Sequence, residues 1–233
     1  MSASNATLYL LDHPEFDPAW KMDVPKLIQW TEDYFVNRSA PGEPANQWGA
    51  NIVGEQDSFI FKMDYQTARY AAECARWYAV SGDGSYKEKA YRSLNWVTYC
   101  NDANGLALES PVSKGITSWW SDCYGEGPRM FYHAFAAIPE WAPPGENHIL
   151  YAEGILRDVF YQPKKIHYKA TSADGTEYLR LAFKPARITL NGNVVSLRSD
   201  ILQQGYLLKD LGDGDYAVTI KRMSPGVIMI TGN

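Results

Sequence analysis

Four acidic residues lie in two long polar stretches of the sequence. Glu55 and Asp57 belong to the stretch QWGANIVGEQDS, and Asp122 and Glu126 belong to the stretch SWWSDCYGEGPRMFYHAF. Cleavage of a glycosidic bond uses two carboxyl groups, about 5 Å apart for retention or about 6.5–9.5 Å apart for inversion. One acid from each stretch would form such a pair across a cleft. Structural roles are the alternative, because Asp122 could cap a turn and Glu126 could face a helix dipole.

The same two stretches are rich in groups that bind sugars. Flat tryptophan and tyrosine rings pack against the C–H faces of pyranose rings, while amide, guanidinium and imidazole groups bind hydroxyls. The candidate substrate-binding residues are Trp48, Asn51, Trp119, Trp120, Tyr124, Arg129 and His133. The competing interpretation places the aromatic residues in the core of a helical domain. Trp119 and Trp120 are adjacent, so at least one of them is expected to face away from such a core.

Other chemistries fit some of these residues. A polysaccharide lyase would need a base, for which Tyr124, His133 or His148 could serve, and a cation such as Arg129 to neutralise a uronate. Cys123 with one of the histidines could form a nucleophile–base pair in an esterase-like hydrolase. A non-catalytic module that holds a glycan or a protein is the third alternative. No nucleotide-binding, zinc-protease or serine-hydrolase motif is present, and we expect no cofactor and no metal.

Helical patterns dominate the first part of the chain. Residues 1–22 are expected to be irregular because prolines follow His13 and Asp17. The predicted helices begin after Asp23 and run to about residue 37, then cover 64–81, about 86–100, 128–138 and 148–161. The second and third of these form an αα-hairpin. The polar stretches therefore lie at the ends of predicted helices.

The hydrophobic period changes to two after about residue 163. Seven short strands are predicted there, with turns at Asp174-Gly175, Asn191-Gly192 and residues 212–215. The fold class is therefore predicted to be α+β, with a helical domain over residues 1–160 and an antiparallel β-sandwich over residues 161–233. All eight tryptophans precede residue 142, which agrees with a change of domain.

The segments 47–58, 63–78 and 118–135, with their order along the chain, resemble carbohydrate-active enzymes built on an (α/α) toroid. Glycoside hydrolases and polysaccharide lyases of the six-hairpin type share this organisation. The resemblance implies a partial α/α toroid followed by a β-sandwich, and a carbohydrate substrate. It assigns no catalytic residue, because no family signature is matched. A full toroid of this type has twelve helices and this chain has about five, so we expect a homo-oligomer to complete it.

Composition limits the remaining possibilities. The chain has 233 residues, a formal net charge of −5 and a pI near 5.4, which argue against a nucleic-acid partner. No apolar run is long enough to cross a membrane, and the N-terminus does not have the pattern of a signal peptide, so the localisation is not assigned. Three unpaired cysteines are expected to be buried thiols rather than disulfides.

Overall fold

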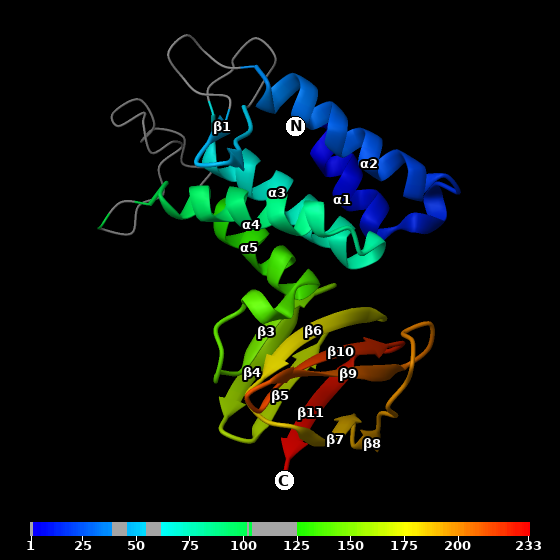
Figure 1. Ribbon diagram of the computed structural model, residues 1–233. Coiled ribbons are helices and arrows are strands. Elements are labelled where there is room, and N and C mark those ends of the chain that lie inside the picture. Colours follow the sequence, from blue (N-terminus) through cyan, green and yellow to red (C-terminus); the bar gives the residue numbers. More distant parts are fainter. Residues whose placement is uncertain (1, 39–45, 55–61, 102, 104–124) are drawn as a thin grey trace. The chain divides into compact units, whose positions relative to one another are not determined.

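The computed structural model describes residues 2–38, 46–54, 62–101, 103 and 125–233. The chain divides into two compact units, Met1–Ala137 and Ile138–Asn233. The first unit is mainly helical and the second consists of antiparallel strands (Figure 1), so the predicted α+β class is confirmed. The division falls before the predicted position near residue 160, because strands begin at His148.

The predicted hairpin and the helix after it are confirmed. The helical unit contains α1 (Ser2–Asp12), α2 (Trp20–Thr31), the π-helical turn η2 (Glu32–Val36), β1 (Asn46–Gln47), β2 (Ala50–Asn51), α3 (Asp64–Ser81), α4 (Gly84–Thr98) and α5 (Glu126–Ala137). The prediction of an irregular N-terminus is wrong. The prolines after His13 and Asp17 separate two helices, with a short 3-10 turn at Pro14–Phe16, instead of preventing both.

Helix α3 is the centre of the helical unit. It packs against α4 and α5 and also contacts α1 and α2 (Figure 1). Every residue from 64 to 75 is buried, so this helix is enclosed on most of its circumference. The polar residues on α3 are therefore inside the unit as well. None of the described helices is long and apolar enough to cross a membrane.

Lys62 fixes the end of the preceding helical segment. Its side chain is 1% exposed, and its Nζ donates hydrogen bonds to the carbonyls of Phe35, Val36 and Arg38. The last carbonyls of a helix have no partner within the helix, and a cation there also opposes the negative end of the helix dipole. This contact ties the segment before α3 to the end of η2.

The second unit contains two antiparallel sheets. One has the order β3 (His148–Ala152), β6 (Gly175–Leu181), β10 (Asp215–Arg222), β9 (Gly205–Gly212); the other has the order β4 (Leu156–Gln162), β5 (Lys165–Ala170), β11 (Gly226–Gly232), β7 (Pro185–Leu190), β8 (Asn193–Val194). The seven predicted strands are confirmed. The helix predicted over 148–161 is wrong, because β3 pairs with β6 and β4 pairs with β5. Gly154, with φ +134°, separates these two strands.

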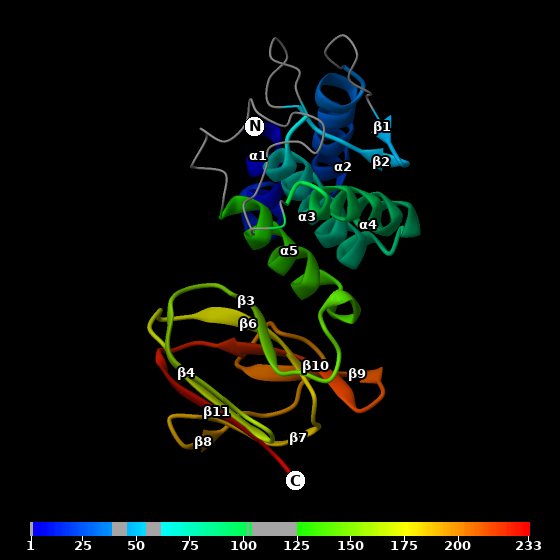
Figure 2. The ribbon, with the colours of Figure 1, turned by 90° about the vertical axis from the view of Figure 1, so that its left-hand side faces the viewer.

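The two sheets share one hydrophobic core. It includes Ile166 and Ile228 from the five-stranded sheet and Leu179 and Val218 from the four-stranded sheet. Figure 2 shows the strands of the four-stranded sheet above those of the five-stranded sheet. Asn191-Gly192 and residues 212–215 form hairpin turns as predicted. The turn at Asp174-Gly175 does not form a hairpin, because it connects β5 to β6 and these strands lie in different sheets.

Candidate functional site

A hollow lies where three helices of the first unit meet at their ends. The start of α3, the end of α4 and α5 from Gly127 to Phe135 surround a volume of about 260 Å³. Its lining residues are Asp64, Val97, Asn101, Gly127, Pro128, Phe131, Tyr132 and Phe135. Aromatic rings from α5 supply an apolar wall, and a carboxylate and an amide supply polar groups. This composition suits an organic ligand that has both an apolar face and hydroxyl groups.

Two carboxylates lie beside the first turn of α5. Asp64, in the first turn of α3, is 3% exposed and lines the hollow. A Cβ atom on Gly127 would lie 3.4 Å from Asp64 Oδ2, so the absent side chain lets α5 approach this acid closely. Glu126 directly precedes Gly127. Sequence reasoning named Glu126 but missed Asp64, which has the ordinary appearance of an acid at a helix N-terminus.

Glu126 is held by two arginines. Its Oε1 accepts a hydrogen bond of 2.5 Å from Arg69 Nη2, and its Oε2 lies 3.6 Å from Arg129 Nη1. Its side chain is 18% exposed and lies in the first turn of α5, where the helix dipole favours an acid. The structural alternative recognised from the sequence thus applies to this residue. The same contacts also fix the carboxylate in one orientation next to the hollow.

His133 and Arg129 are one turn apart on α5 but differ in exposure. His133 is 7% exposed, whereas the Arg129 side chain is 62% exposed. Burial, together with Arg76 and Arg129, lowers the pKa of His133 to about 4. The imidazole is therefore neutral at pH 7. Arg76 is itself paired with an acid, because its Nη2 lies 2.6 Å from Asp12 Oδ1. A neutral imidazole can accept a proton, but His133 does not line the hollow.

Two buried polar residues, Arg69 and Glu73, follow Asp64 along α3. Glu73 is fully buried, and its carboxylate faces the hydroxyls of Ser4 and Thr7 on α1. Burial raises the pKa of Glu73 to about 7, although Ser4 and Arg69 oppose this shift. Sequence reasoning did not name Glu73 or Arg69. Apolar residues around most of a helix would have indicated that its polar residues are buried as well.

Trp48 is exposed, as a sugar-binding aromatic residue would be. It lies in the turn between β1 and β2 with φ +55°, is 60% exposed, and its ring centroid is 4.9 Å from that of Tyr99 in an edge-to-face arrangement. Asn51 has a defined partner, because its Nδ2 donates a hydrogen bond of 2.8 Å to the Tyr70 hydroxyl. The backbone carbonyl of Asn51 accepts a hydrogen bond from Ser93. These contacts hold the β1–β2 hairpin against α3 and α4.

Several predicted site residues lie outside the described residues. They are Glu55, Asp57, Trp119, Trp120, Asp122, Cys123 and Tyr124. The pairing of one acid from each polar stretch therefore stays a prediction. Cys74 and Cys100 are buried free thiols, in agreement with the expectation from the sequence. Their burial raises the pKa of both thiols, which argues against their use as nucleophiles.

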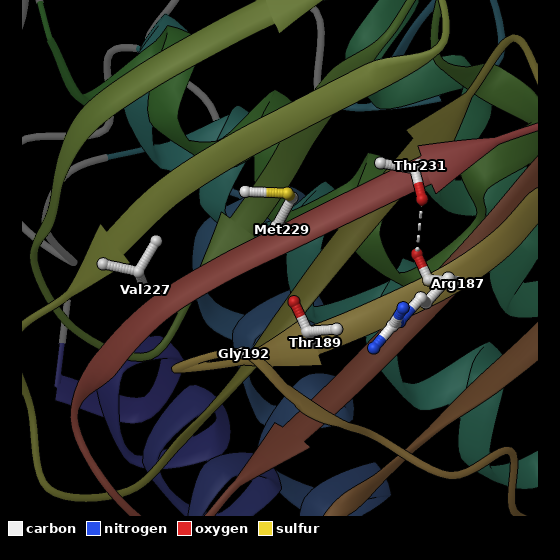
Figure 3. A pocket seen from close by; sticks show the side chains of 6 residues that line it. All are labelled: Arg187, Thr189, Gly192, Val227, Met229 and Thr231. Atoms are coloured by element: carbon white, nitrogen blue, oxygen red, sulfur yellow. Dashed lines mark hydrogen bonds between the residues drawn. The ribbon is translucent and has the colours of Figure 1, made fainter.

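The strand unit has a second hollow, of about 330 Å³, over β7 and β11 (Figure 3). Its lining residues are Arg187, Thr189, Gly192, Val227, Met229 and Thr231. Asp215, in the turn at residues 212–215, is paired with Arg180, because its Oδ2 accepts a hydrogen bond of 2.6 Å from the Arg180 guanidinium. Within the described part of the chain, no three His, Cys, Asp or Glu side chains are grouped to hold a metal ion.

Comparison with known proteins gives no relative from which a function can be transferred. No protein-family model matches this sequence, and no curated protein matches it either.

Proposed function

We propose that this chain is a carbohydrate-active enzyme, most simply a glycosidase-like hydrolase, with its site in the helical unit. The observation that supports this proposal is the hollow between α3, α4 and α5, which has an aromatic wall and the carboxylate Asp64. Glu126 adjoins the hollow through Gly127. Aromatic rings beside carboxylates are the chemistry that sugar binding and glycoside cleavage require. In this proposal Asp64 and Glu126 act near the reacting bond, and acids from residues 55–57 or Asp122 complete the site.

Two alternatives are kept because specific contacts favour them. Both oxygens of Glu126 face arginines, which suits a module that binds a glycan without cleaving it. The exposed cation Arg129, one turn before His133 on α5, suits a lyase in which a guanidinium neutralises the carboxylate of a uronate. These alternatives differ in product, so one screen separates them.

The test is a screen of the purified chain against chromogenic aryl glycosides and uronate polymers. Released phenol is expected, and Glu126→Gln and Asp64→Asn should each lower kcat by at least about 10²-fold, the usual contribution of acid–base catalysis. Glu88→Gln is the matched control, because Glu88 is an exposed acid on α4. Thermal denaturation checks that the variants fold. Turnover that is unchanged in both variants would refute the catalytic assignment, and an unsaturated product would favour the lyase.

We also propose a finer description of the fold and assembly. The core shared by two antiparallel sheets supports a β-sandwich, and the α3–α4 hairpin with α5 supports part of an α/α toroid. Exposed large apolar residues on the first two helices support self-association; they are Tyr9, Met22 and Trp30. We expect a homodimer or a larger oligomer by light scattering. A monomer at micromolar concentration would contradict this expectation.

A further inference from the structure

The outer face of the five-stranded sheet has an ordered pattern of side chains. Alternate residues of β5, β7 and β11 point into the core, and the residues between them point outward. Cross-strand pairing arranges the outward residues of this sheet in three rows. The middle row contains Phe160, His167, Met229, Thr189 and Val194, and it crosses all five strands.

The middle row is largely apolar and open to solvent. Phe160 is 56% exposed, Met229 is 38% exposed and Val194 is 62% exposed. The Phe160 and His167 rings are stacked, with centroids 4.7 Å apart and planes at 25°. Five strands at about 4.8 Å spacing give a platform about 19 Å long. A platform of this length has room for an oligosaccharide rather than a single sugar.

Cations border this row on both sides. Arg157 and Lys169 lie in one flanking row, and Lys165 and Arg187 lie in the other. None of these four side chains forms an ion pair with a residue in the described part of the chain. The flanking rows contain no acid. The nearest acid in the sequence is Asp158, in the bulge of β4.

The hollow in Figure 3 lies over β7 and β11, within this pattern. The Arg187 side chain, the Thr189 and Thr231 hydroxyls, and the apolar groups of Val227 and Met229 line it. The Thr231 hydroxyl donates a hydrogen bond of 3.4 Å to the Arg187 backbone carbonyl, which joins β11 to β7 at this hollow. A carboxylate beside Arg187 and sugar hydroxyls beside the threonines would satisfy each of these groups.

We infer that the outer face of the five-stranded sheet binds an anionic polysaccharide of the uronate class. The sugar rings pack along the row from Phe160 to Val194, and their carboxylates face the cations on either side. This inference rests on the proposed carbohydrate function and names the class of glycan. Charge complementarity selects an anionic polymer, and the formal net charge of −5 for the whole chain disfavours the denser charge of a nucleic acid.

The experiment measures binding of the full chain to polygalacturonate by isothermal titration calorimetry, with a neutral glucan as the second probe. The double variant Lys165→Gln/Lys169→Gln and the variant Phe160→Ala should each weaken polygalacturonate binding at least tenfold. The matched control is Lys184→Gln/Lys209→Gln, because these lysines lie outside the outer face and their replacement removes the same charge. The control should bind within twofold of the native chain, and the glucan should not compete.

Three outcomes would overturn the inference. The double variant could bind like the native chain, the control could weaken binding as much as the double variant does, or polyglutamate or a single-stranded oligonucleotide could bind more tightly at the same residues. Failure of the proposed function is distinguishable from these results. Glu126→Gln should lose turnover of an aryl glycoside and keep polygalacturonate binding, whereas the face variants should keep that turnover and lose the binding.

Discussion

Replacement of Glu73 by Gln tests whether burial in the helical unit raises the pKa of this carboxyl. The Glu73 carboxyl is fully buried, and burial raises its pKa from 4.5 to about 7. Between these two pH values the folded chain keeps a proton that the unfolded chain has lost. The free energy of unfolding therefore falls as the pH rises through this window, and above pH 7 the loss is complete. Gln cannot ionise, so the variant should lack this contribution.

The size of the effect follows from the two pKa values. At about 1.4 kcal/mol per pH unit, the interval from 4.5 to about 7 corresponds to about 3 kcal/mol. The difference in unfolding free energy between variant and native chain should thus shift by about 3 kcal/mol in favour of the variant between pH 4.5 and pH 8. This shift does not depend on any constant effect of the substitution on packing.

The assay is urea unfolding followed by tryptophan fluorescence at several pH values. All tryptophans except Trp141 belong to the helical unit, so the signal reports mainly on the unit that contains Glu73. Glu88→Gln is the control, because the Glu88 side chain is 57% exposed and forms a surface ion pair with Arg92. A difference between Glu73→Gln and the native chain that stays constant from pH 4.5 to pH 8 would refute the reasoning.

Three further substitutions test other contacts. Asp215→Asn should lower the free energy of unfolding by about 3–5 kcal/mol, because it leaves the buried Arg180 without its carboxylate. Arg180 and the Gly145 amide outweigh burial and lower the Asp215 pKa, so this stabilisation should be lost as the pH falls below 3.8 in acid titrations followed by circular dichroism. Lys62→Met should cost about 2 kcal/mol in urea unfolding, because carbonyls at the end of η2 lose their donor. Gly49→Ala should lower the thermal midpoint, because φ +78° costs an L-residue about 1–2 kcal/mol and its Cβ would meet the Arg92 guanidinium.

Periodicity predicted the elements whose pattern was unambiguous. The helix over 64–81 and the strands after residue 163 have clear periods of 3.6 and 2, and the structure contains both. The segment 148–161 has apolar residues that fit a helix as well as two strands. Pairing with β6 and β5, which are distant in the sequence, makes it strands. Local pattern alone could not decide this case.

Some residues of the candidate site could likewise be named from the sequence, and others only from the structure. Composition and the polar stretches drew attention to Glu126 and Trp48 from the sequence alone, because acids and exposed aromatic residues carry recognisable chemistry. The position of Asp64 next to Gly127 required the packing of α5 on α3, and the raised pKa of Glu73 required its burial next to α1. The sequence determined which side chains were present and which elements carried them. Only the tertiary structure decided which of them lie together and which lose contact with water, because these properties depend on contacts between residues far apart in the chain.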